Sequence, residues 1–172
     1  MPSQNIISYG QIDKITLPDA WVKVDASAPM SSFSCEYYHP HNYKDTRLYL
    51  MGHNPPLDDI TGNGFLKLIK MAAHDITFSD FEAISLILRG AEKTENFLLK
   101  SVMPKNHNGK DVLIIEGLWK ERKYDTFWVL IPVIDNEHNS VFLQEFIYSS
   151  PSNLYQEFFN NAIQSFDSIK WR

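Results

Sequence analysis

Alternating apolar and polar positions dominate the second half of the chain. Four runs have the β-branched and aromatic content of strands, and they cover residues 96–103, 112–119, 126–133 and 141–148. Turn-rich joints connect them, and joints this short leave no room for crossover helices. The pattern therefore predicts an antiparallel meander.

Apolar residues spaced three and four apart predict two helices before this meander. The first stripe covers residues 65–76, with Thr61 or Asn63 as its N-terminal cap. The second covers residues 79–88, although its apolar run 84–88 is also compatible with a buried strand. We leave the helix and the strand open as alternatives for that segment.

A third stripe predicts an aromatic-rich C-terminal helix over residues 154–166, with Ser152 as its N-cap. Shorter extended pieces are predicted at residues 12–17, 21–24, 33–39 and 47–51, and again in the tail from residue 168. We therefore expect a single α+β domain over residues 1–172. In it, one twisted antiparallel sheet is covered by helices, with the C-terminal helix central to the layer.

Two segments resemble PsbP-like proteins. The stretch Ile15-Thr16-Leu17-Pro18-Asp19-Ala20-Trp21 is similar to their opening strand, Leu-Pro and Trp. Tyr148-Ser149-Ser150-Pro151 before an aromatic helix, followed by Phe166-Asp167-Ser168-Ile169-Lys170-Trp171, resembles their ending. This superfamily includes the PsbP subunit of photosystem II, a Ran-binding nuclear-import factor and bacterial DcrB-type domains. The resemblance implies an α/β/α sandwich and an accessory or binding role. Residues 78–95 do not align with it, and no functional residue is carried over.

The charge balance disfavours two classes of partner. Sixteen Lys and Arg face 21 Asp and Glu, giving a net charge of −5, so a basic face for nucleic acid or for an anionic membrane is not expected. No apolar window is as long as a membrane span, and the N-terminus lacks the features of a signal peptide. One cysteine excludes an intrachain disulfide. We expect a cytoplasmic protein that is not inserted in a membrane.

Aromatic residues make up 13% of the chain, which favours a sheet-rich core over an aromatic binding site. Cys35 lies in an alternating segment and is expected to be buried and inert. A nucleophilic role is disfavoured because nothing nearby in the sequence lowers its pKa.

Three histidines form the one candidate metal site. His39 and His41 lie at a strand end and His53 follows the next strand, so the rings would converge with Asp45 or Asp58 if the strands pair suitably. The spacing matches no known zinc motif, and solvated loop histidines are the favoured interpretation. The remaining histidines are each expected to stand alone, on a helix or in turns: His74, His107 and His138.

Acidic and glycine-rich segments give weaker candidates. Glu116 and Glu145 lie within apolar strands and are expected to face solvent opposite the core, although a carboxylate pair could catalyse glycoside cleavage. The segment Gly62-Asn63-Gly64-Phe65 before a helix could present N–H groups to an anion. The other notable acids are Asp58, Asp59 and Glu121.

The function favoured by the sequence is that of a non-enzymatic interaction or accessory protein of unknown partner. We predict no catalytic, cofactor-binding or metal-binding residue and no cofactor. One alternative is a small-molecule-binding domain or an unassigned enzyme with an aromatic pocket between sheet and helices. The other is a metal protein that uses His39, His41 and His53.

Overall fold

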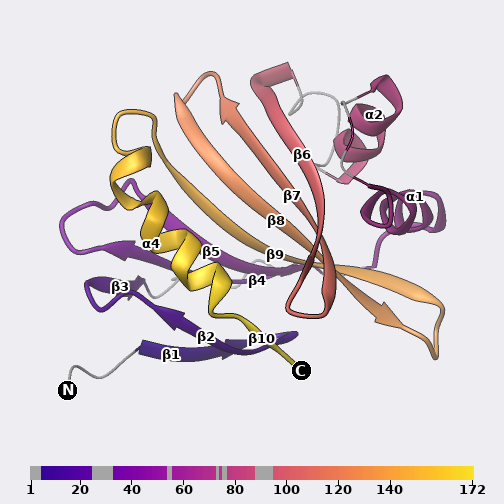
Figure 1. Ribbon diagram of the computed structural model, residues 1–172, viewed down its shortest axis with the longest axis horizontal. Coiled ribbons are helices and arrows are strands. Elements are labelled where there is room, and N and C mark those ends of the chain that lie inside the picture. The colour runs from indigo at the N-terminus through magenta and orange to yellow at the C-terminus, as the bar shows by residue number, and fades with distance from the viewer. Residues whose placement is uncertain (1–4, 25–32, 54–55, 73, 75–76, 88–94) are drawn as a thin grey trace.

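Two antiparallel sheets form the body of the protein. The computed structural model describes residues 5–24, 33–53, 56–72, 74, 77–87 and 95–172 (Figure 1). The large sheet has seven strands in the order β3-β4-β5-β9-β8-β7-β6, and every neighbouring pair is antiparallel. Its strands are β3 (Trp21–Val24), β4 (Phe33–Pro40), β5 (Arg47–His53), β6 (Phe97–His107), β7 (Lys110–Trp119), β8 (Tyr124–Asp135) and β9 (Ser140–Pro151).

The predicted meander is confirmed, but its strands are longer than the apolar runs. We expected β6 to end at Pro104, but it continues to His107. The turn to β7 is then made by Asn108 and Gly109, whose φ values are 50° and 90°. Pro104 is tolerated because β6 is at the edge of the sheet, where a missing N–H breaks no ladder on the open side. Likewise β9 extends through Ser149 and Ser150, which pair with β8.

A second sheet was not anticipated. β1 (Asn5–Tyr9), β2 (Ile12–Leu17) and β10 (Lys170–Trp171) form a separate three-stranded sheet, so the expectation of one sheet is wrong. The tail is extended as predicted, but it pairs with β2 at the other end of the chain. Side chains secure this pairing: the Ser168 hydroxyl accepts the Thr16 N–H at 2.8 Å. Such a long-range pairing leaves no local sequence signal.

The C-terminal helix α4 (Tyr155–Asp167) packs on one face of the large sheet, as predicted (Figure 1). Phe166 is 1% exposed and lies in a cluster with Phe127 and Phe146. Ser152 is not the cap: its hydroxyl donates to the Lys123 carbonyl at 3.0 Å, and the helix begins after Leu154 without a side-chain cap.

Helices α1 (Asp59–Ile69) and α2 (Phe78–Ile87) cover part of the opposite face, which makes the architecture an α/β/α sandwich. Asp58 caps α1 by accepting the Thr61 N–H at 2.9 Å, so the helix begins earlier than expected. It ends at Ile69, seven residues before the predicted end at residue 76. The segment 84–87 is helical, and the strand alternative is wrong there; residue 88 lies outside the described residues. Among the described helices, none combines the length and apolarity required to span a membrane.

Candidate functional site

Helices α1 and α2 leave part of their sheet face uncovered, and a groove of about 900 Å³ lies there. Its apolar lining comes from strands that are far apart in the sequence but adjacent in the sheet. Among the lining residues are Tyr49, Trp119, Tyr124, Trp128 and Ile147. The groove is therefore built from β5, β7, β8 and β9.

Strand alternation puts these side chains on one face. On β5, Leu48 and Leu50 pack in the core under α4, so Arg47, Tyr49 and Met51 face the other way, into the groove. Antiparallel pairing then arranges the lining in cross-strand rows. Tyr49, Ile147 and Trp128 are register partners in one row, and Arg47, Ser149 and Thr126 in the next.

Arg47 is held in place at this groove. Its Nε donates to the Lys44 carbonyl at 2.8 Å, and its Nη1 donates to the Tyr49 hydroxyl at 3.3 Å. The guanidinium also lies 5.6 Å from the centre of the Tyr37 ring, which is within the range of a cation–π contact. The hydrogen bond to Tyr49 raises the pKa of Arg47, and burial raises the pKa of Tyr49. The cation is thus fixed among tyrosines.

A buried carboxylate–imidazole pair lies next to the groove. Glu145 is 3% exposed, pairs with His53 and accepts the Trp128 indole N–H at 3.1 Å. The expectation that Glu145 faces solvent is therefore wrong, because it contacts His53 and Trp128 and lies on the face that carries the second apolar cluster. A carboxylate in this position orients the Trp128 ring, which is itself part of the groove lining.

Cys35 pairs with Met51 across β4 and β5 and is partly exposed rather than buried. Burial, and then the negative charges of Glu145 and Glu36, raise the pKa of its thiol. A raised pKa lowers the thiolate fraction at neutral pH, which supports an inert cysteine.

The three histidines of the metal hypothesis do not converge. His53 is the register partner of Phe33, whereas His39 lies six residues along the same strand, about 20 Å away at 3.3 Å per residue. His39 instead donates from Nδ1 to the Pro40 carbonyl at 2.8 Å, and His41 is exposed in the turn. Within the described ranges, no three His, Cys, Asp or Glu residues are grouped closely enough to hold a metal ion.

The carboxylate pair and the glycine-rich anion site are also not assembled. Glu116 is the register partner of Phe127 and lies on the α4 side of the sheet, so Glu116 and Glu145 are on opposite faces. Gly62 and Gly64 lie inside α1, and the Gly62 N–H donates to the Asp58 carbonyl at 2.8 Å. That N–H is therefore used within the helix and does not point at an anion site.

The other histidines have structural partners, so the expectation that each stands alone is wrong. His107 is 5% exposed, stacks on Phe166 with ring centres 4.0 Å apart, and hydrogen-bonds through Nε2 to the Phe166 carbonyl at 3.0 Å. Burial lowers the pKa of His107. His74 and His138 are paired with Asp80 and Asp135, each at 2.8 Å.

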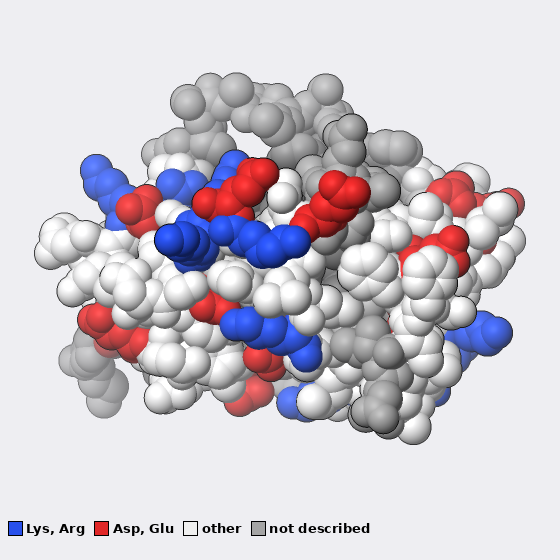
Figure 2. Space-filling model, turned by 90° about the horizontal axis from the view of Figure 1, so that it is seen from above, with Lys and Arg blue, Asp and Glu red and all other residues white. Residues whose placement is uncertain are grey.

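Charged residues at the groove are of both signs. Asp45, Arg47, Glu121 and Arg122 all line it. Figure 2 shows the same mixture on the upper face of the molecule, where Lys and Arg side chains lie beside Asp and Glu side chains. The surface around the groove is therefore not a basic patch of the kind that nucleic acid requires.

The groove residues were not singled out from the sequence. The high aromatic content was the available signal, together with the alternation of Arg47, Tyr49 and Met51 against buried leucines. Neither feature shows that the ring faces are left uncovered, because that depends on where α1 and α2 end.

The sheet order, the helix on each face and the closing helix–strand segment define a PsbP-like fold, in agreement with the resemblance of the two terminal segments. The structure is similar to cyanobacterial PsbP (CyanoP) from Synechocystis, with a TM-score of 0.59, 12% identity, and coverage of 100% of this chain and 94% of that chain. It is also similar to LpqN of Mycobacterium tuberculosis, a protein involved in cell envelope biogenesis, with a TM-score of 0.50, 10% identity, and coverage of 98% and 90%. No family model and no curated protein sequence matches the chain. At these identities the similarity establishes the fold alone.

Proposed function

We propose that this protein is a non-enzymatic interaction protein and that it binds a partner protein in the aromatic groove. The observation that carries the proposal is the composition of the lining: Tyr49, Trp119, Tyr124 and Trp128 lie together with Arg47. Trp, Tyr and Arg are the residue types that most often dominate the binding energy of protein interfaces. The Trp and Tyr rings are rigid, so little conformational entropy is lost when a partner covers them.

Two further features support binding rather than catalysis. Glu145 and His53 are engaged with each other, and Glu145 also holds the Trp128 indole, which suits a positioning role. In addition, the resemblance to PsbP-like proteins connects the chain to a superfamily whose members are mostly accessory or binding proteins. The proposal thus rests first on the groove and second on the fold.

The experiment is an affinity capture followed by quantitative binding. The wild-type protein captures a partner from host lysate, the partner is identified by mass spectrometry, and its affinity for purified variants is measured. Tyr124→Ala should weaken binding by about tenfold or more if Tyr124 is an interface hot spot. Circular dichroism and thermal unfolding verify that the variant is folded.

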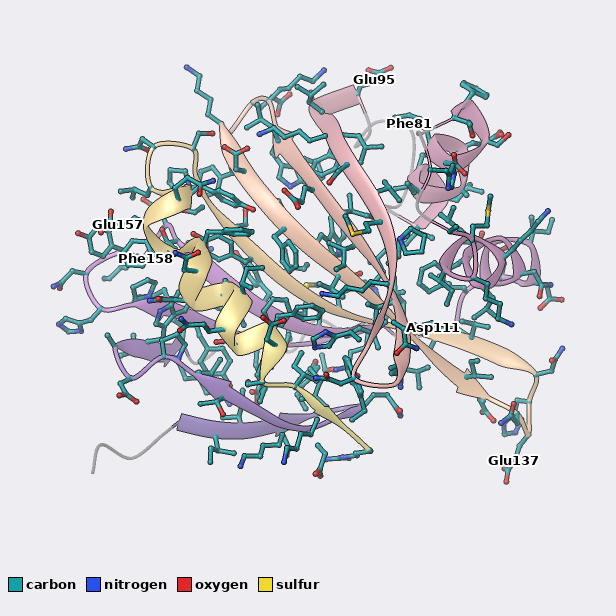
Figure 3. All side chains as sticks on the ribbon, viewed as in Figure 1. Phe81, Glu95, Asp111, Glu137, Glu157 and Phe158 are labelled. Carbon is teal, nitrogen blue, oxygen red and sulfur yellow. The ribbon has the colours of Figure 1, made fainter. Side chains whose placement is uncertain are left out.

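Two control substitutions lie outside the groove. Phe78→Ser removes an aromatic ring that is 80% exposed on α2. Glu137→Ala changes the tip of the β8–β9 turn, which Figure 3 shows well away from the sheet centre. Both controls should bind the partner as the wild type does. Unchanged binding by Tyr124→Ala would refute the groove as the binding surface.

A second candidate function is the binding of a small organic molecule. The volume of about 900 Å³ favours it, because ligand pockets in proteins span roughly 300–1,000 Å³. A library of planar aromatic compounds tested by thermal shift should give a stabilising hit that is lost in Tyr124→Ala. If no compound stabilises the wild type, the partner-protein proposal is left as the better account.

A further inference from the structure

Arg47 differs from the other charged residues of the groove. Asp45, Glu121 and Arg122 are exposed, so their charges are screened by water and salt, and their side chains would lose entropy on binding. Arg47 is partly buried and already held by the Lys44 carbonyl. Arg47 therefore favours a negatively charged group on the ligand.

The guanidinium of Arg47 has donors to spare. Its two hydrogen bonds to described residues use one N–H on Nε and one on Nη1, and a guanidinium carries five N–H groups, so three are left on the two Nη atoms. In the described part of the chain, no carboxylate lies within 4.0 Å of it. An arginine that stacks on an aromatic ring and has an unused pair of N–H donors is suited to bind a carboxylate, because its planar fork can donate to both carboxylate oxygens.

Apolar surface begins one row away from this cation. The row that contains Arg47, Ser149 and Thr126 is adjacent to the row of Tyr49, Ile147 and Trp128. Rows on one face of a sheet are about 7 Å apart, which is close to the spacing of side chains two residues apart on an extended segment. A ligand with an acidic group beside a planar apolar group therefore fits both rows at once.

We infer that the groove selects an acidic–aromatic segment of the partner protein, in which a Glu or Asp carboxylate binds Arg47 and an aromatic side chain two residues away packs against Trp128 in the adjacent row. This inference rests on the proposed function, because it specifies the chemistry of the partner in the same groove. The Ser149 and Thr126 hydroxyls, which hydrogen-bond to each other at 3.0 Å, lie in the same row as Arg47.

The test uses two blocked peptides that differ only in Glu or Gln at the position two residues from a Trp, titrated into isotope-labelled protein and followed by NMR. The Glu peptide should shift groove resonances at millimolar concentration and bind about tenfold or more tightly than the Gln peptide, as expected for a hydrogen bond to a charged group. Arg47→Gln should remove this preference and leave the weak Gln-peptide binding unchanged, which also shows that the variant is folded. Arg47→Lys should keep only part of it.

Control substitutions are Arg122→Gln, an exposed arginine of the same groove, and Arg172→Gln at the C-terminus. Both should retain most of the preference for the Glu peptide. Equal binding of the two peptides, absence of any shift, or an unaltered preference in Arg47→Gln overturns the inference.

A second probe pair separates a protein segment from a free aromatic acid. If indole-3-acetate binds as tightly as the Glu peptide, and indole-3-acetamide does not, the ligand is a small aromatic acid and the assignment to a partner segment is wrong. The captured partner keeps the two proposals distinct. If its affinity falls in Tyr124→Ala but not in Arg47→Gln, the groove remains the binding surface and only the acidic–aromatic inference fails.

Discussion

Replacement of Phe166 by Ala tests the packing on which the architecture depends. Phe166 is 1% exposed on α4, and its ring centre lies 5.7 Å from that of Phe127, 5.6 Å from that of Phe146 and 4.0 Å from that of His107. It therefore joins the helix to two central strands and to the end of β6. Ala at this position leaves a cavity that the sheet backbone cannot close, because the sheet is held by its own hydrogen bonds.

The magnitude follows from the burial. Truncation of a buried Phe to Ala costs about 3–5 kcal/mol, and this site belongs in that range because aromatic rings surround it. A whole domain is stable by roughly 5–15 kcal/mol, so the substitution removes a large share of the free energy of unfolding. With a urea slope of about 2 kcal/mol per M, the unfolding midpoint should fall by roughly 1.5–2.5 M.

Urea unfolding monitored by far-UV circular dichroism measures this change. Phe78→Ala is the matched control, because that ring is 80% exposed and its removal should alter the free energy of unfolding by less than about 0.5 kcal/mol. If Phe166→Ala lowers stability by less than about 1 kcal/mol, or no more than the control does, then α4 does not dock on the sheet as described, and the fold assignment fails with it.

Three further predictions concern single side chains. Burial lowers the pKa of His107, so the unfolded chain binds a proton on this residue more readily, and stability should fall as the pH drops below about 6.5. Urea midpoints measured between about pH 7.5 and pH 5 should depend less on pH in His107→Phe than in the wild type. Gly117→Ala should cost about 1–3 kcal/mol in the same assay, because its Cβ would overlap the Phe97 ring. Tyr148→Phe should cost about 0.5–1.5 kcal/mol, because it removes the buried hydrogen bond to the Tyr155 carbonyl at 2.8 Å; unchanged midpoints in either variant would contradict these contacts.

Periodicity was sufficient for the large elements. Alternation over residues 96–148 predicted four antiparallel strands, and the aromatic stripe over residues 154–166 predicted α4 on the sheet, because both patterns directly reflect which side of an element is buried. The element ends were less accurate. Asp58, rather than Thr61 or Asn63, caps α1, and β6 passes through Pro104, since a cap or a strand end depends on hydrogen-bond partners as well as on residue type.

The candidate site was predicted much less completely. The expectation for Glu145 failed because alternation places a side chain on a face but does not say whether another layer covers that face. His107 was expected to stand alone in a turn, whereas it is held by Phe166, which lies 59 residues further along the chain. Both errors concern contacts between segments that no local pattern links.

By itself, the sequence determined the α+β class, the antiparallel meander and the amphipathic closing helix, since these follow from the spacing of apolar residues along one segment. The tertiary structure alone decided the pairing of β2 with β10, the burial of Glu145 beside His53, and the position of the groove. The physical reason is that these features arise where separate segments meet. The groove lies over β5, β9, β8 and β7, on the part of the face that α1 and α2 do not cover, and that boundary is set by packing between layers.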